Sequence, residues 1–321
     1  MPITLENDYL RTTIDPDQGT SLHSFQVRRE NAWLSLMPDV DDPACDLAAA
    51  SFLMIPYSNR IADGAFAFAD QSYQLNNANQ HAIHGDVRKR PWVIAEQSPQ
   101  RLVCTFESAD QARSEGGDAV NWPWSFAVRA EYELSDHTLR QRLALTNRAQ
   151  EPMPAGCGWH PFFNRTLTRA DVSKMGASHS DTAPAAPPVH LNFQVESAYP
   201  DGYGNRIPSG PAQPLAEHQN FSSEKPLVPD NFLDTCFHGY NGQGHITWPQ
   251  SGIRLRFACS SACSHLILYN PAEKPYFAVE PVTNANDGVN LLGRDEPTAG
   301  TTVLQPGERL TSDCVLRMEV A

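Results

Sequence analysis

Two neighbouring stretches of the sequence decide the fold class: FAVRAEY at residues 126–132 and LRQRLAL at residues 139–145. Apolar and polar side chains alternate along both stretches. This period of two is typical of an antiparallel strand that has one face buried and the other in water. The stretch IRLRF at residues 253–257 alternates in the same way. We therefore expect strands, rather than helices, to build this protein.

Shorter strand signals recur toward the N-terminus. Residues 3–5 and 10–14 are separated by a turn-like Glu-Asn-Asp, and residues 66–68 and 73–75 flank another turn. Helical periodicity is scarce, and residues 108–117 are at most a short helix or a loop. The sequence therefore predicts an all-β fold, a large antiparallel β-sandwich.

The chain has 26 prolines, and many of them lie between Pro184 and Pro229, together with Gly, Ser, Asn and Asp. Such a segment is either a linker between two domains or a set of long surface loops. Because alternating strands resume on both sides of it, we favour loops within a single domain that spans residues 1–321. The composition leaves open whether this segment covers a cleft as a lid.

Composition argues against several classes of partner. The chain has 321 residues, and 24 basic against 37 acidic side chains give a net charge of −13. This balance disfavours nucleic acids and anionic lipid surfaces, which attract clustered Lys and Arg. No apolar run approaches the roughly 20 residues that span a bilayer. The seven cysteines are odd in number and scattered, so we expect reduced thiols in a cytoplasmic protein, with no nucleic-acid or membrane partner.

Four short segments carry residues suited to chemistry: IPYSNRIADGAF at 55–66, HAIHG at 81–85, GWHPFFN at 158–164 and VEPVT at 279–283. His160 and Glu280 each precede a proline, which favours an extended backbone and fixes the direction of the side chain. Each residue also has a plain structural explanation. A single histidine is more often a satisfied or exposed residue than a catalyst, and Glu280 could protect a strand edge.

Other kinds of site find little support. His81 and His84 would point to opposite faces of an extended strand, and the pair Cys259 and Cys263 lacks a second matching pair. We therefore expect no metal site. The motifs G-x-S-x-G and G-x-G-x-x-G are missing from the sequence, which argues against an elbow serine nucleophile and a nucleotide cofactor.

Five motifs in chain order resemble those of the aldose 1-epimerases, or galactose mutarotases: NRI..G.F at 59–66, HG at 84–85, HPFFN at 160–164, LDTCF at 233–237 and EPVT at 280–283. The resemblance extends over nearly the whole chain. It implies the galactose mutarotase-like supersandwich and an isomerase that interconverts the α and β anomers of a free aldohexose such as galactose or glucose. It also implies that no cofactor is needed, that Glu280 is the catalytic base and His160 the catalytic acid, and that Arg60, His84 and Asp234 bind the sugar hydroxyls.

The resemblance leaves the substrate open. Asp86 stands where many members of the family have a second glycine, and Arg88 and Arg90, before Trp92, are similar to residues of the related sugar-phosphate mutarotases. A hexose-6-phosphate mutarotase is therefore an alternative, with both arginines contacting the phosphate. A non-catalytic sugar-binding β-sandwich is another. The oligomeric state, monomer or homodimer, also stays open.

The proposed chemistry carries an expectation about charge. A free histidine is mostly deprotonated at neutral pH and is then a poor acid. We therefore expect Asp234 or Glu280 to lie close to His160 and to keep it partly charged. Trp159 is predicted either to offer a flat apolar face to the sugar or to be part of the core.

Overall fold

The computed structural model describes residues 1–76, 80–111, 119–170 and 187–320. About 49% of the residues are in strands and 7% in helices, and the paired strands of the two large sheets run antiparallel. The all-β, antiparallel prediction is confirmed. None of the helices in the described ranges has the length and apolar character needed to cross a membrane.

A twelve-stranded sheet, here called sheet A, carries the candidate site. Its main path runs in the order β1 (Ile3–Glu6), β2 (Leu10–Asp15), β3 (Ser21–Arg29), β5 (Ser51–Met54), β15 (Gly158–Asn164), β25 (Tyr276–Val282), β24 (His265–Asn270), β21 (Leu233–His238), β18 (Ser197–Ala198) and β19 (Gln213–Pro214). Two further strands lie off this path: β4 (Ala32–Ser35) and β16 (Thr168–Arg169). Strands from the two ends of the chain therefore meet at the centre of sheet A.

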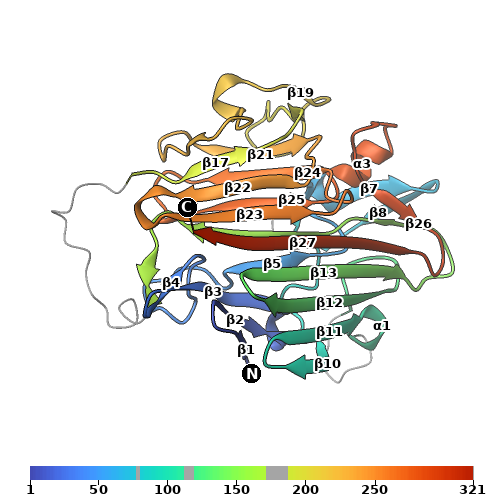
Figure 1. Ribbon diagram of the computed structural model, residues 1–321. Coiled ribbons are helices and arrows are strands. Elements are labelled where there is room, and N and C mark those ends of the chain that lie inside the picture. The colour runs from blue at the N-terminus through green and yellow to red at the C-terminus, as the bar shows by residue number, and fades with distance from the viewer. Residues whose placement is uncertain (77–79, 112–118, 171–186, 321) are drawn as a thin grey trace.

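A nine-stranded sheet, sheet B, forms the other layer. Its order is β10 (Val93–Ser98), β11 (Arg101–Glu107), β12 (Phe126–Ser135), β13 (Thr138–Asn147), β27 (Arg309–Val320), β23 (Ile253–Cys259), β22 (Gln243–Trp248), β17 (His190–Phe193) and β20 (Lys225–Pro226). Figure 1 shows most of these strands following one another from the bottom to the top of the view.

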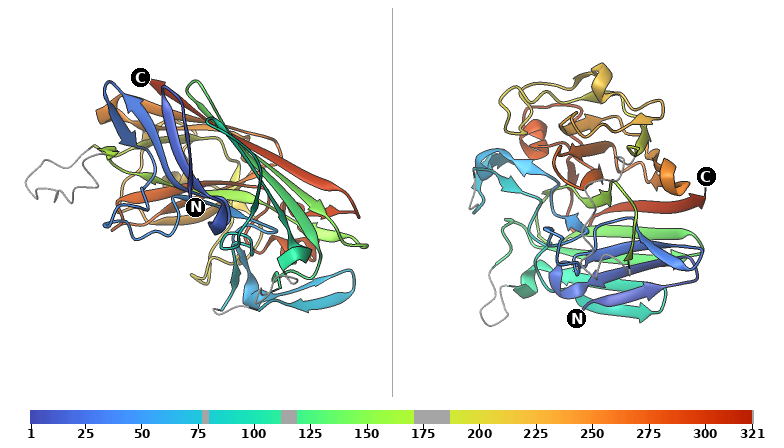
Figure 2. Two further views of the ribbon diagram at one scale, coloured as in Figure 1. Left: turned by 90° about the horizontal axis from the view of Figure 1, so that it is seen from below. Right: turned by 90° about the vertical axis from the view of Figure 1, so that its left-hand side faces the viewer.

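Smaller elements cap one end of the sheets. The pairs are β14 (Met153–Ala155) with β26 (Thr302–Leu304), β6 (Arg60–Ile61) with β9 (Ala82–Ile83), and β7 (Ala65–Phe68) with β8 (Gln71–Gln74). The short helices are α1 (Ser108–Gln111) and α3 (Gly288–Leu292). The hairpin of β7 and β8 lies at the edge of the molecule in both views of Figure 2 and has α3 beside it in Figure 1.

The main core lies between the two large sheets. Sheet A contributes side chains such as Trp159, Phe163 and Phe277, and sheet B contributes side chains such as Leu143 and Phe257. Because successive side chains of a strand point to opposite faces, the even-numbered residues of β15 and β25 lie on the outer face of sheet A. This parity places His160 and Glu280 outside the main core.

The strands predicted from alternation are β12, β13 and β23 of sheet B. β12 and β13 form a hairpin in which Ala130 pairs with Leu143, and burial alternates along both. Their apolar face meets the core and their polar face meets water, which is the physical origin of the period of two.

The proline-rich segment contributes to both sheets. Within its described part, β17 and β20 join sheet B, and β18 and β19 join sheet A. The expected long surface loops are thus interrupted by short strands. Pro214 and Pro226 lie in the terminal strands β19 and β20, where a residue without an N–H group costs no ladder hydrogen bond on the open side. Residues 184–186 lie outside the described residues.

Candidate active site

Strand register lines up a row of side chains across the outer face of sheet A. From β5 to β21 the directly opposed residues are Phe52, His160, Glu280, Ile267 and Cys236. Asp234 lies on the same face, because it precedes Cys236 by two residues. The register therefore brings together three of the predicted site residues that are distant in sequence.

The central feature of the row is a direct contact between His160 and Glu280. The His160 Nε2 and Glu280 Oε1 atoms are 3.2 Å apart, and both side chains are almost fully buried. The ladder between β15 and β25 has bridges on either side of this pair but none at His160 itself, and a proline follows each of the two residues. Proline has no N–H group to donate, so the backbone pairing opens where the two side chains meet.

Burial sets the charge of this pair. It raises the pKa of Glu280 well above its usual range; the nearby charge of Asp234 adds to this increase and Arg60 opposes it. Burial also lowers the pKa of His160 to about 3, with the positive charges of Arg88 and Arg60 acting in the same direction. Both shifts favour a protonated glutamate beside a neutral imidazole.

The predicted proximity of Glu280 to His160 is confirmed, but the predicted partial charge on His160 is wrong for the free site. Desolvation lowers the pKa of His160 and raises that of Glu280, so the shared proton favours Glu280. Asp234 does not contact His160, because its carboxylate is bound by an arginine, as described below.

Aromatic rings hold the imidazole of His160 in place. The ring of Phe52 stacks on it with a centroid distance of 4.5 Å, and Phe162 lies at 4.5 Å in a tilted arrangement. His84 meets it edge-on at 5.2 Å. These contacts limit rotation of the imidazole and leave its Nε2 directed at Glu280.

At His84 the backbone passes very close to the segment that contains Ile55 and Asn59. His84 has a φ of 63°, in the left-handed region, and its backbone N–H donates to the carbonyl of Asn59 at 2.6 Å. The following Gly85 has a φ of 64°, and a Cβ there would lie 1.9 Å from the carbonyl oxygen of Ile55. Only glycine fits this position. Burial lowers the pKa of His84 well below its usual value, so His84 acts as a neutral hydrogen-bonding group.

Arg60 is positioned by its neighbour and by the segment after β25. Its Nη1 donates to Asn59 Oδ1 at 2.8 Å, and its backbone carbonyl accepts from the N–H of Asp287 at 2.7 Å. Asp287 is fully buried, and its Oδ1 accepts from the backbone of Ala62 at 2.9 Å. Two segments more than 200 residues apart in sequence are thereby joined beside the His160–Glu280 pair.

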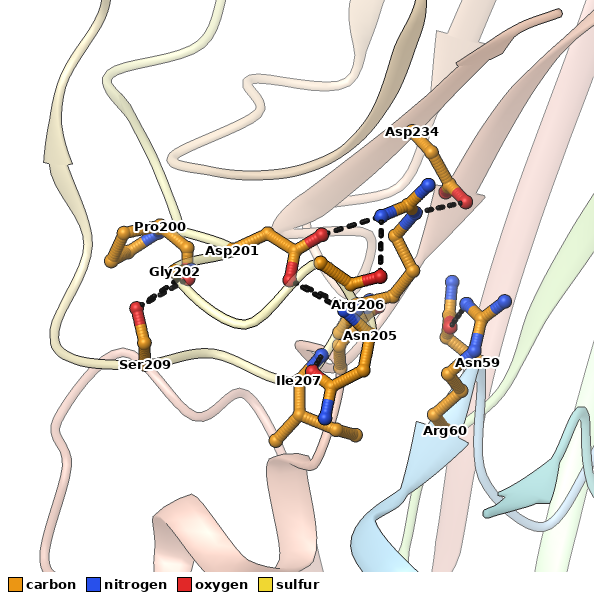
Figure 3. Close-up of polar contacts among 12 residues, drawn as sticks. Asn59, Arg60, Pro200, Asp201, Gly202, Asn205, Arg206, Ile207, Ser209 and Asp234 are labelled. Carbon is orange, nitrogen blue, oxygen red and sulfur yellow. Dashed lines mark hydrogen bonds and ion pairs between the residues drawn. The ribbon is translucent and has the colours of Figure 1, made fainter. Parts of the chain in front are cut away.

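Asp234 is bound by an arginine that sequence reasoning missed. Arg206 Nε donates to Asp234 Oδ2 at 2.7 Å, and Arg206 Nη1 donates to Asp201 Oδ2 at 2.6 Å. Figure 3 shows the guanidinium between the two carboxylates, with Asn59 and Arg60 drawn beside this group. The negative charge of Asp234 near Glu280 is thus partly neutralised.

Comparison with known sequences identifies the family. The sequence model of the aldose 1-epimerase family matches residues 1–317. The chain belongs to the aldose 1-epimerase family.

Relatives in this family share its length and fold. The chain is 26% identical over 282 residues to the uncharacterised protein YphB of Escherichia coli K12, covering 84% of each chain. Its structure is similar to that of a galactose mutarotase-like protein of Clostridium acetobutylicum, with a TM-score of 0.79, 21% identity and coverage of 100% of this chain and 95% of that one. A galactose 1-epimerase of Lactobacillus acidophilus gives a TM-score of 0.71 at 17% identity, with coverage of 99% and 94%. These structural matches show that the fold is the galactose mutarotase-like one.

The two other arginines singled out from the sequence have different surroundings. Arg90 Nη2 donates to Asp86 Oδ2 at 2.7 Å, so its charge is paired. Arg88 lies over the ring of Phe52 at 5.1 Å, and none of the described carboxylates forms an ion pair with it. Its charge influences His84 and His160. Arg88 therefore borders the site, whereas Arg90 supports the loop.

The structure also shows the surroundings of several other residues that the sequence singled out. Trp159 is 1% exposed and part of the main core, so it does not face the candidate site. His81 and His84 do not share an extended strand, because β9 covers only residues 82–83; His81 instead accepts from the backbone of Asp63 at 3.0 Å. All seven cysteines are free thiols, and no group of three metal-ligating side chains occurs in the part of the chain that the structure describes.

The supporting residues that sequence reasoning missed fall in two places. The first is the run TNANDG at 283–288, whose dense short polar side chains directly after a buried strand were a readable signal. Asn284 is an example, since its Oδ1 accepts from the Ser58 hydroxyl at 3.0 Å. The second place is Arg206, which lies in a loop whose sequence carries no comparable signal.

Proposed function

We propose that this protein is an aldose 1-epimerase that interconverts the α and β anomers of a free aldohexose. One observation carries the proposal: a buried carboxyl and a buried imidazole in contact at 3.2 Å on the family's sugar-binding fold. Glu280 Oε2 is buried and has no hydrogen-bond partner among the described residues. A buried carboxylate oxygen without a partner is costly, and a sugar hydroxyl would supply the missing hydrogen.

The reaction needs only proton transfers. In its ionised form Glu280 removes the proton from the C1 hydroxyl, while protonated His160 gives a proton to the ring oxygen. The bond between C1 and the ring oxygen breaks, the C1–C2 bond rotates, and the reverse transfers close the ring on the other face. Each positioned group contributes roughly 10²- to 10⁴-fold to the rate.

Proton accounting links this mechanism to the pKa shifts. The reactive pair, an ionised Glu280 with a charged His160, holds one proton, as does the neutral pair that burial favours. Ring opening converts the first form into the second through the sugar. Because burial favours the neutral pair in the free site, a proton must first pass from Glu280 to His160, and ring opening then returns the pair to its neutral form.

Arg60, His84 and Asp234 are proposed to bind the sugar hydroxyls. A guanidinium offers several hydrogen-bond donors in a planar fork, which suits Arg60 to this role. His84, which directly follows β9, and Asp234 of β21 approach the pair from its two sides. The site draws on residues from Phe52 to Asp287, which supports the expectation of a single domain over residues 1–321.

A phosphorylated hexose is a second candidate, favoured by Arg88. An arginine whose guanidinium borders the site without a carboxylate partner among the described residues is suited to an anionic substituent. Arg90 does not support this alternative, because Asp86 binds it. A non-catalytic sugar-binding role is less well supported, since such a module has no use for an acid and a base in contact.

Polarimetry tests the proposal. A freshly dissolved α-anomer drifts to equilibrium unaided, and catalytic amounts of the protein should accelerate that drift. Parallel measurements with galactose, glucose and glucose 6-phosphate identify the substrate class. A large preference for the phosphate would favour the second candidate, and no acceleration of any sugar would refute an epimerase function.

A further inference from the structure

Near the His160–Glu280 pair, sheet A borders a small polar pocket. Its lining includes Asp201, Arg206, Asp234, Cys236 and Asn286. Cys236 belongs to the same cross-strand row as Glu280, with one strand between them. Two strand spacings amount to about 10 Å, so the pocket begins where the far end of a bound sugar would lie.

Arg206 is held in this pocket by several independent contacts. Asp201 and Asp234 bind its Nη1 and Nε atoms, and the ring of Phe232 lies 5.3 Å from the guanidinium carbon. Its backbone carbonyl accepts from Asn286 Nδ2 at 2.8 Å. Its φ of 70° is in the left-handed region, which is unfavourable for a non-glycine residue. The chain accepts this local strain, and three of the contacts, with Asp201, Asp234 and Phe232, hold the side chain.

The hydrogen-bonding groups that remain free in the pocket are complementary to hydroxyls. Arg206 Nη2 and Asp234 Oδ1 have no hydrogen-bond partner within the described ranges. The Oδ1 atom of Asn286, a residue only 3% exposed, is buried and also unpartnered there. One donor and two acceptors thus line a single small pocket. A hydroxyl both donates and accepts, so two neighbouring hydroxyls satisfy such a set, whereas an anion cannot donate to the acceptors.

The net charge of the pocket also favours hydroxyl groups over an anion. Two carboxylates, Asp201 and Asp234, surround one guanidinium, so the pocket carries a net negative charge. An anionic substituent would be repelled here, in contrast to the region near Arg88. The pocket therefore suits the neutral, hydroxylated part of a sugar.

We propose that Arg206 and Asn286 form, beside Asp234, a subsite for hydroxyl groups at the end of the sugar remote from C1, and that Arg206 determines specificity for those hydroxyls. This inference rests on the proposed sugar substrate. Arg206 acts in two ways: it holds Asp234 Oδ2 so that Oδ1 stays directed at the ligand, and its free Nη2 donates to the same ligand.

The test combines a variant with a set of sugars. Arg206→Met removes the donors and keeps an unbranched apolar side chain, and Arg206→Lys restores the charge without the planar fork. The matched control is Arg142→Met, which breaks a similar arginine–aspartate pair, Arg142 Nε to Asp313 Oδ1 at 2.8 Å, on sheet B. Each protein is assayed by polarimetry with the parent hexose and its monodeoxy derivatives, and binding of the same sugars is measured by calorimetry.

The unaltered protein should discriminate against at least one monodeoxy sugar by about tenfold or more, the value of one hydrogen bond to a charged group. Arg206→Met should raise KM for the parent sugar about tenfold with kcat nearly unchanged, and should lose that discrimination, because the variant no longer senses the hydroxyl. Arg206→Lys should recover part of both effects, and Arg142→Met should change neither.

An Arg206→Met protein that keeps the full discrimination among deoxy sugars, or that loses kcat alone, would overturn the subsite. The failure of the proposed function has a different signature. If the unaltered protein binds sugars without accelerating mutarotation, the epimerase proposal falls while the calorimetric comparison still decides the subsite. If it neither binds nor accelerates any sugar, both proposals fall.

Discussion

Replacing Glu280 by glutamine separates basicity from shape at the centre of the site. Glutamine has the same number of heavy atoms, so the contact with the His160 imidazole, 3.2 Å away in the unaltered protein, can be kept while the proton acceptor is lost. We expect the accelerated mutarotation to fall by about 10²- to 10⁴-fold, the usual contribution of a general base. This corresponds to roughly 3–5 kcal/mol in the activation barrier.

The same substitution should not destabilise the protein. The pKa of Glu280 is raised in the folded state, so the folded protein binds more protons than the unfolded chain above the unfolded pKa. Stability is therefore lost as pH rises from the unfolded toward the folded pKa. A neutral amide removes this penalty, and the Tm at pH 8 should stay equal or rise by roughly a few degrees. Loss of activity together with unchanged or greater stability is the signature of a functional buried carboxyl.

The assay is polarimetry of a fresh α-anomer, corrected for the spontaneous rate, with thermal unfolding of the same samples. Glu133→Gln is the matched control, because Glu133 is an exposed residue of β12 on the other sheet, and both activity and Tm should match those of the parent. His160→Asn combined with Glu280→Gln should be about as slow as the slower single variant, since the two residues act as one unit. A Glu280→Gln protein that keeps more than a tenth of the parental rate would refute the assignment of the base.

Three further predictions follow from the geometry of the site. The pH–rate profile should be bell-shaped, because acid adds a second proton to the His160–Glu280 pair and alkali removes its only one. The acid limb of the profile should lie well below pH 6.5, since the pKa of His160 is lowered to about 3. An acid limb near 6.5 would contradict the neutral resting pair. Arg60→Ala should raise KM more than it lowers kcat if Arg60 provides uniform binding, and the reverse pattern in steady-state kinetics would assign it to the transition state. Gly85→Ala should lower the Tm and raise KM, because its Cβ would lie 1.9 Å from a backbone carbonyl oxygen and displace the loop that carries His84; an unchanged Tm in a thermal melt would show that this close approach is not maintained.

The sequence alone does not tell which of the two arginines, Arg88 or Arg90, could contact a substrate. Arg88 and Arg90 are two residues apart and looked equivalent in the sequence, yet Asp86 binds Arg90 while Arg88 lies over Phe52 beside the site. The difference comes from the loop conformation, which lets one side chain reach the Asp86 carboxylate and directs the other to an aromatic face. Only one of the two is therefore available to a ligand.

By itself, the sequence determined the class of fold, and its resemblance to the aldose 1-epimerases singled out His160 and Glu280. A period of two along residues 126–132 and 139–145 can bury one face only as a strand, and the prolines after His160 and Glu280 require an extended backbone at both. These are local properties of the chain, so local sequence is sufficient to predict them.

Only the tertiary structure decided how those residues meet and what charge they carry. The register of β15 on β25 brings together His160 and Glu280, which are 120 positions apart in sequence, and the same alternation turns Trp159 into the core instead of the site. Arg206 reaches Asp234 from a loop with no recognisable pattern. The neutral state of His160 arises because many distant segments together exclude water from the imidazole, and desolvation of this kind is a property of the packed molecule rather than of any stretch of sequence.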